Sequence, residues 1–104
     1  MAWGFLLVAG LLEVVWAFSM KQSQGFTQPG PTAVTVVAML ASLGLLALAM
    51  RSLPLGTAYM VWTGIGAVGA FVVGVMVLGE ALTLQRVIAA ALILAGMVTM
   101  KLAS

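Results

Sequence analysis

A single carboxylate, Glu13, lies in the middle of an apolar segment, residues 2–20, in a chain with two acidic residues and no histidine. A segment of this length and hydropathy predicts a helix that crosses a membrane. Acidic side chains are rare in such helices because an unpaired charge is costly in hydrocarbon, and those that occur commonly bind protons or ions. We therefore expect Glu13 to lie at the centre of the protein's function.

Two residues, three positions away on either side, share the helix face of Glu13. Gly10 leaves space one turn before the carboxylate, and Trp16 offers an aromatic surface one turn after it. This stripe predicts the lining of a small cavity. Glycine also lets membrane helices approach closely, and a tryptophan can simply fill volume. The packing interpretation therefore stays open beside the functional one.

Aromatic residues recur on a later apolar segment, residues 57–79, where Tyr59 and Trp62 share one face. Aromatic faces attract cations, by roughly 0.5–2 kcal/mol depending on how far water is excluded. Together with Glu13 they are consistent with a cation site. The alternative is an aromatic belt at the membrane interface, because Tyr59 lies near the start of its segment.

Small residues form two further groups in the second half of the chain. Three glycines within six residues predict either a hinge or a close helix contact; they are Gly64, Gly66 and Gly69. A second group forms a stripe on the last apolar segment, where we expect a dimerisation surface; it comprises Ala91, Ala95 and Gly96.

Few other polar residues lie in or near the apolar segments. Ser42 can hydrogen-bond to its own helix, or it can orient a nearby carboxylate. Glu80 falls between two apolar segments, where we expect a solvated loop carboxylate. Thr83 is a suitable N-cap for the segment that follows.

The elements that position these residues follow from composition, which is 64% hydrophobic and only 6% charged. A membrane helix needs about 20 apolar residues, and four such segments fit into the 104 residues, at about 2–20, 32–50, 57–79 and 84–100. Glycine, proline and charged residues separate them. The sequence thus predicts an all-α integral membrane protein in which residues 1–104 form one four-helix transmembrane domain. The first segment lacks the flanking features of a cleaved signal peptide, so we expect it to be retained.

Several function classes are excluded by what the sequence lacks. Without cysteine or histidine there is no thiolate, imidazole base or typical zinc site, so we expect no metal and no cofactor. The phosphate-binding pattern G-x-x-x-x-G-K-[ST] is absent, which argues against an ATP-driven or hydrolytic mechanism. The four cations are scattered and do not form a nucleic-acid patch. The chain is therefore not expected to be an enzyme.

The cations are evenly divided between the two sides of the membrane. With four crossings, Arg51 and Lys101 share one side, and Lys21 and Arg86 lie on the other. The orientation of a membrane protein follows the imbalance of lysine and arginine between its loops, and here there is none apart from the amino terminus. Either other features orient the chain, or copies insert in both directions and pair antiparallel. A homodimer would also supply the walls that a solute pocket needs.

Taken together, these motifs resemble the small multidrug resistance family of four-helix transporters over essentially the whole chain. The resemblance is carried by LLEVVWAFSMK, GFT and LPLGTAYMVWTGIGAVGA. Within that family, EVVWA and GTAYMVWTGIGA are similar to the guanidinium-exporter branch (Gdx or SugE-type). The drug-exporting branch more often has a small residue and threonine in place of Trp16 and Ala17.

The resemblance implies an antiparallel, dual-topology homodimer in the inner (plasma) membrane, in which two Glu13 side chains form one shared site. It also implies a proton-coupled antiporter that exports guanidinium and related guanidinyl cations by alternating access. By their positions in the sequence, the resemblance assigns four further residues to this site. Ser42 and Trp16 would lie beside the carboxylate, and Trp62 would form a wall of the site. Tyr59 would be a partner that switches between the two protomers. The glycines at 64–69 would bend, and the last helix would hold the dimer together.

The mechanism can also be argued from physical chemistry. Two carboxylates in one cavity titrate as a coupled pair, and protons compete there with a cation. Guanidinium is planar and matches carboxylates through paired hydrogen bonds. Three alternatives stay open: a broad exporter of quaternary ammonium or other drug cations from the same family, an ion-carrying subunit of a rotary ring, and a membrane assembly factor that does not transport.

Overall fold

The computed structural model describes residues 2–103, which form four helices. They are α1 (Ala2–Gln22), α2 (Pro29–Ala49), α3 (Leu55–Met76) and α4 (Leu84–Leu102). All four are long and apolar enough to cross a membrane. The expectation of an all-α membrane protein with four spanning helices is therefore confirmed.

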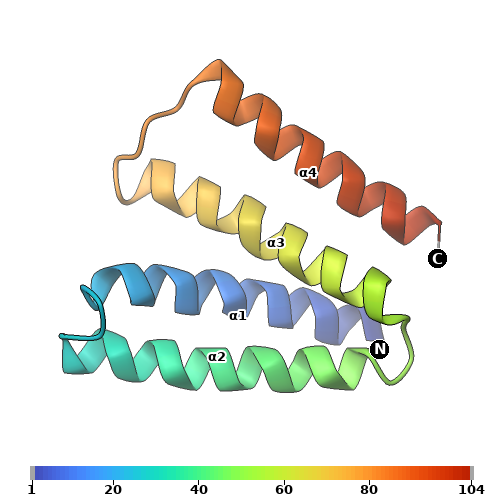
Figure 1. Cartoon of the computed structure of the whole chain (residues 1–104), viewed down its shortest axis with the longest axis horizontal. Helices are drawn as coiled ribbons and strands as arrows, with labels where there is room; N and C mark the ends of the chain where they lie inside the picture. The colour runs from blue at the N-terminus through green and yellow to red at the C-terminus, as the bar shows by residue number, and fades with distance from the viewer. Residues whose placement is uncertain (1, 104) are drawn as a thin grey trace.

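The helices lie side by side in a flat layer of 40 × 34 × 16 Å, in the spatial order α2, α1, α3, α4 (Figure 1). The α1–α2 and α3–α4 loops are at one end of the layer, and both chain ends and the α2–α3 loop are at the other (Figure 1). As a result, Lys21 and Arg86 belong to one end and Arg51 and Lys101 to the other. This is the division of positive charge that the sequence predicted.

The ends of the helices follow from proline, glycine and threonine chemistry. Helix α2 begins at Pro29, three residues earlier than expected, because proline is tolerated in a first turn that needs no backbone donor. Helix α3 ends at Met76 and not at Gly79, whose positive φ of 70° places it in a turn. Thr83 caps α4 by accepting a hydrogen bond from the Arg86 backbone N–H at 3.2 Å, as predicted.

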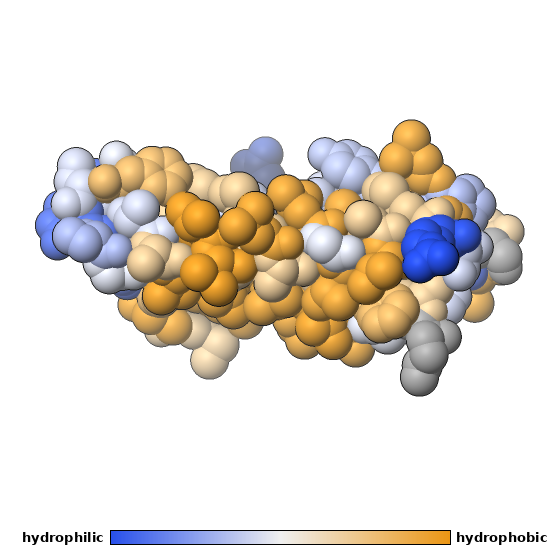
Figure 2. Space-filling view, turned by 90° about the horizontal axis from the view of Figure 1, so that it is seen from below, coloured by the Kyte–Doolittle hydropathy of each residue, from blue (hydrophilic) through white to orange (hydrophobic). Residues whose placement is uncertain are grey.

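The buried core is small and lies toward the end of the layer that holds the chain termini. It is built by α1, α2 and α3, and its members are Leu6, Ala9, Leu46, Ala49, Ala58, Val61 and Trp62. On the edge of the layer formed by α2, apolar side chains cover the middle and hydrophilic ones gather toward the two ends (Figure 2). A surface of this kind suits lipid or another apolar chain, since water would not solvate it.

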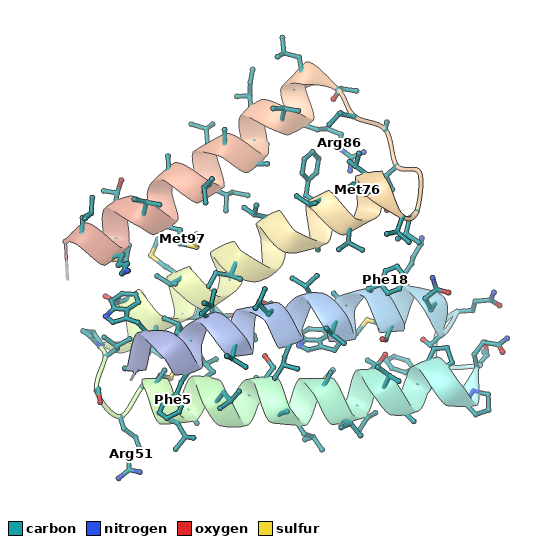
Figure 3. The ribbon with its side chains drawn as sticks, turned by 180° about the vertical axis from the view of Figure 1, so that it is seen from behind. Phe5, Phe18, Arg51, Met76, Arg86 and Met97 are labelled. Atoms are coloured by element: carbon teal, nitrogen blue, oxygen red, sulfur yellow. The ribbon has the colours of Figure 1, made fainter. Side chains whose placement is uncertain are left out.

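Helix α4 contributes no buried residue to this layer within the part of the chain that the structure describes. It lies beside α3, toward which Met97 points (Figure 3). At the far end, the Lys101 ammonium group lies 5.3 Å from the ring centre of Trp3, so one side chain joins α4 to α1. Most of the α4 surface is therefore open.

Glycines set the close approach of α1 and α3. A Cβ atom on Gly10 would meet the Ile65 side chain, and one on Gly69 would meet Val14. Gly66 faces α1 as well, whereas Gly64 faces Met97 of α4. Helix α3 is continuous through the segment that holds Gly64, Gly66 and Gly69. The contacts explain these glycines by close packing, and the hinge role stays a prediction.

Gly10→Ala should destabilise the fold, because the added methyl group has to displace Ile65 in a packed helix interface. We expect a loss of about 1–3 kcal/mol, which is typical of overpacking. Gly4→Ala on the same helix is the matched control, since a Cβ there meets nothing within 4 Å. Equilibrium unfolding in mixed micelles would measure both variants, and equal effects would contradict this account of the α1–α3 contact.

Candidate functional site

Glu13 lies in the middle of α1, on the side that faces α3, and its side chain is partly buried. One carboxylate oxygen, Oε1, is buried and has no hydrogen-bond partner among residues 2–103. The ion pair found in this part of the chain joins Arg86 to the other acidic residue, Glu80. Glu13 is thus a carboxylate in a membrane-spanning segment, and its buried Oε1 accepts no hydrogen bond from the described chain.

The position of this carboxylate depends on Gly66 of α3. A side chain at residue 66 would collide with the carboxyl group of Glu13. The absence of a Cβ therefore lets the acid lie directly against the α3 backbone. The sequence predicted a hinge or a close helix contact at Gly66, but it did not reveal that Glu13 is the residue in contact. Only the run of glycines signalled that α3 approaches a neighbour closely.

Trp16 provides a second buried polar atom without a partner. It lies one turn after Glu13 on α1 and packs against the core cluster. Its indole Nε1 is buried and donates no hydrogen bond to residues 2–103. In hydrocarbon, an unsatisfied polar group costs several kcal/mol. One acceptor and one donor, a helical turn apart, are therefore available for groups outside the described chain.

Ser42 of α2 is fully buried and links three helices. Its hydroxyl donates to the Ala9 carbonyl oxygen of α1 at 2.7 Å and accepts from the Trp62 Nε1–H of α3 at 3.0 Å. The serine therefore fixes the turn of α1 that precedes Glu13. Its hydrogen bonds go to these two groups and not to the carboxylate, and its place beside Glu13 in the site stays a prediction. The sequence did not reveal the part played by the Ala9 carbonyl.

The two aromatic residues of α3 are in contact but lie in different surroundings. Their ring centres are 5.5 Å apart and the planes are tilted by 39°. Trp62 is buried, with 7% of its surface exposed, whereas Tyr59 is 53% exposed. Tyr59 lines a cavity of about 430 Å³ between α3 and α4, together with Thr63 and Gly96. Trp62 is thus part of the buried core, whereas Tyr59 is exposed beside the α3–α4 cavity.

The small residues of α4 are exposed. This applies to Ala91, Ala95 and Gly96, and a Cβ on Gly96 would meet nothing within 4 Å. The stripe is therefore free to accept another helix. Its role in dimerisation stays a prediction.

Four spanning helices with a partly buried carboxylate between α1 and α3 define a small multi-pass membrane protein with a polar site at bilayer depth. The chain belongs to the family described as Small Multidrug Resistance protein, whose family model matches residues 1–93. It is accordingly a multi-pass transporter of the inner membrane.

Relatives match the chain along its whole length. A protein of Yersinia pseudotuberculosis serotype I (strain IP32953) is 57% identical over 104 residues, which is all of both chains, and is named "Guanidinium exporter". Proteins with the same name in Citrobacter freundii and in Escherichia coli O6:H1 are 51% and 53% identical. Each of these alignments covers 100% of this chain and 99% of the relative.

Ser42→Ala should destabilise the protein because it leaves the indole N–H of Trp62 buried without an acceptor. We expect a loss of about 1–2 kcal/mol, given the modest strength of helix-to-helix hydrogen bonds in membranes. Thr99→Ala is the control, since the Thr99 hydroxyl bonds only within the exposed face of α4. Unfolding titrations of both variants measure the difference. If Ser42 and Trp62 are coupled through this bond, the double variant Ser42→Ala/Trp62→Phe should lose less free energy of unfolding than the two single variants together. A loss equal to their sum would contradict the coupling.

Proposed function

We propose that this protein is a proton-coupled antiporter that exports guanidinium and related small guanidinyl cations. The observation that carries the proposal is the buried Glu13 Oε1 atom without a partner in the described chain. Family membership supports export of a cation, and the relatives named "Guanidinium exporter" support the choice of cation. Glu13 binds either a proton or the substrate, and this competition couples the two fluxes.

The chemistry around Glu13 suits a planar cation with several N–H donors. A carboxylate accepts paired hydrogen bonds from a guanidinium group, and a free Oε1 supplies acceptor capacity for them. Aromatic rings near the acid add an attraction for positive charge; Trp16 lies on the same helix, and Trp62 lies in the adjoining core. Guanidinium stays charged at cellular pH, so it needs a protein to cross the bilayer.

A second copy of the chain completes the proposed site. One copy is a layer only 16 Å in its shortest dimension, with an open α4 surface. An antiparallel partner on that layer encloses the carboxylate, and its own Glu13 offers an acceptor for the buried Trp16 N–H. The even division of cations between the two ends of the layer agrees with insertion in both directions. In this dimer α4 supplies the contact between copies, through Ala91, Ala95 and Gly96.

Glu13→Gln should abolish coupled exchange, because an amide neither releases a proton nor carries the charge that attracts the cation. Purified protein in liposomes should take up guanidinium when a proton gradient is imposed, and the variant should fall to the level of protein-free liposomes. Glu13→Asp is the matched control, since it keeps a titratable carboxylate and should retain measurable exchange. Unaltered exchange in Glu13→Gln would refute the assignment.

The same assay with a panel of cations separates guanidinium export from broad drug export. Tetrapropylammonium has no N–H donor, so it cannot form the paired hydrogen bonds proposed for guanidinium. Comparable transport of both cations would favour the broad-specificity alternative.

Dual topology can be tested with a cysteine, because the natural chain has none. Gln22→Cys places a thiol at the exposed end of α1, beside the α1–α2 loop. If copies insert in both directions, a membrane-impermeant maleimide should label about half of the thiols from outside intact cells and the rest only after permeabilisation. Labelling from one side alone would mean a fixed orientation.

A further inference from the structure

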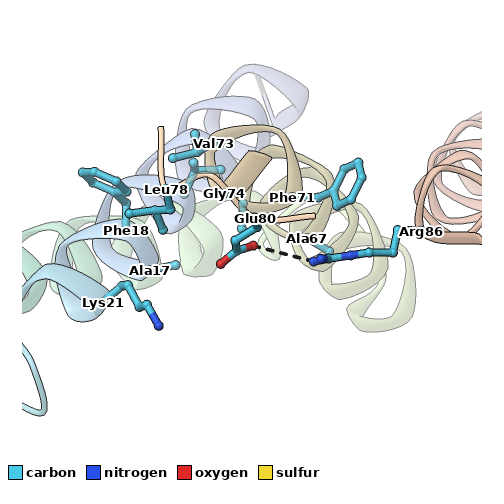
Figure 4. Close-up of a pocket in the computed structure, with 12 residues that line it drawn as sticks. Ala17, Phe18, Lys21, Ala67, Phe71, Val73, Gly74, Leu78, Glu80 and Arg86 are labelled. Carbon is cyan, nitrogen blue, oxygen red and sulfur yellow. Dashed lines mark ion pairs between the residues drawn. The ribbon is translucent and has the colours of Figure 1, made fainter. Parts of the chain in front are cut away.

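A cavity with three charged residues in its otherwise apolar lining lies at the end of the layer that carries the α1–α2 and α3–α4 loops. Its volume is about 330 Å³, and Glu13 is not part of its lining. Residues from α1, α3, the α3–α4 loop and the start of α4 line it (Figure 4); those used below are Lys21, Phe71, Gly74, Glu80 and Arg86. The cavity thus combines one carboxylate and two cations beside an aromatic ring.

The guanidinium group of Arg86 is held by three kinds of contact at this cavity. Its Nη2 atom lies 3.6 Å from Glu80 Oε1 (Figure 4). Its Nη1–H donates to the Ala81 carbonyl oxygen at 2.9 Å. The carbon at its centre lies 5.6 Å from the centre of the Phe71 ring. Carboxylate, carbonyl and aromatic face are the groups that recognise a free guanidinium ion.

The acidic partner in this contact is positioned by the backbone. The positive φ of Gly79 turns the chain back toward α3, and the Glu80 N–H donates to the Gly74 carbonyl oxygen at 3.0 Å. The Glu80 carboxylate lies against Gly74, where a Cβ would collide with it. Glu80 is an exposed loop carboxylate, as expected, and these two contacts direct it to one place.

Arg86, in contrast, reaches the site at the end of a long flexible side chain. The Arg86 and Glu80 side chains are 43% and 39% exposed, so water and small solutes have access to the contact. An exposed ion pair of this kind contributes little to stability. It can therefore open without a large penalty and leave the Glu80 carboxylate to another cation.

We propose that Glu80, the Phe71 ring and the Ala81 carbonyl form a second binding site for guanidinium cations, which Arg86 occupies in this structure and a free guanidinium ion displaces. The choice of guanidinium as a physiological ligand rests on the proposed function. Binding is weak, because the tethered Arg86 competes at an effective concentration in the millimolar range. The Lys21 ammonium group in the same cavity weakens it further.

Displacement of Arg86 can be observed directly by NMR. Guanidinium chloride is titrated into ¹⁵N-labelled Glu13→Gln protein, in which the bilayer site is disabled. The Arg86 Nε–H signal should shift saturably, while that of Arg51, the chain's other arginine, which lies at the opposite end of the layer and points away from it (Figure 3), should not. Tetrapropylammonium chloride at equal concentration should leave both signals in place.

Two further variants test the composition of the site. Glu80→Gln should abolish the saturable response of Arg86, because the acceptor charge is lost. Arg86→Ala should strengthen guanidinium binding severalfold, followed at the Glu80 backbone amide, because the tethered competitor is gone. If either Glu13→Gln or Arg86→Ala fails to fold, the titration of the natural chain with the Arg51 control still decides the question.

Several outcomes overturn the proposal: an Arg86 signal that does not move, a shift shared equally by Arg51, or a response that survives Glu80→Gln. These are separable from failure of the transport assignment. Coupled exchange that depends on Glu13, without displacement of Arg86, refutes the second site alone. A saturable Arg86 response in a chain that exchanges nothing refutes the antiporter and leaves the second site standing.

Discussion

The unsatisfied carboxylate oxygen of Glu13 is the constraint on which the rest of the structure depends. Hydrocarbon offers no water to an exposed polar atom, so an acid at this depth must find a proton, a cation or a protein donor. Among residues 2–103, Oε1 has no hydrogen-bond partner. An arrangement that stays incomplete without an external partner is what a binding site in a membrane requires.

Small residues bring this acid to a defined place. Glycines at the α1–α3 contact allow the backbones to approach, and Gly66 leaves room for the carboxyl group itself. Ser42 then ties α2 to α1 through Ala9 and to α3 through Trp62. Because hydrophobic burial does not drive helices together in lipid, close contact and a few hydrogen bonds fix the position of the acid.

The two acidic residues of the chain illustrate how position decides chemistry. Glu80 lies at the end of the layer, where a loop and a nearby helix start bring Arg86 to it. Glu13 lies in the middle of a spanning helix, where a compensating cation from the same chain would carry its own desolvation cost. Glu80 is thus paired with a cation of the same chain and remains accessible, whereas Glu13 Oε1 has no partner among residues 2–103.

The sequence by itself determined the four spanning segments, the division of positive charge between the two ends, the N-cap at Thr83 and the depth of Glu13. These follow from hydropathy, spacing and local hydrogen bonding, which act within one segment. Only the tertiary structure decided that Gly66 lies against Glu13, that Ser42 bonds to Trp62 and not to the acid, and that Tyr59 faces outward. Helical periodicity defines the faces of each helix, but the rotation and register of one helix against another depend on packing between segments distant in the chain.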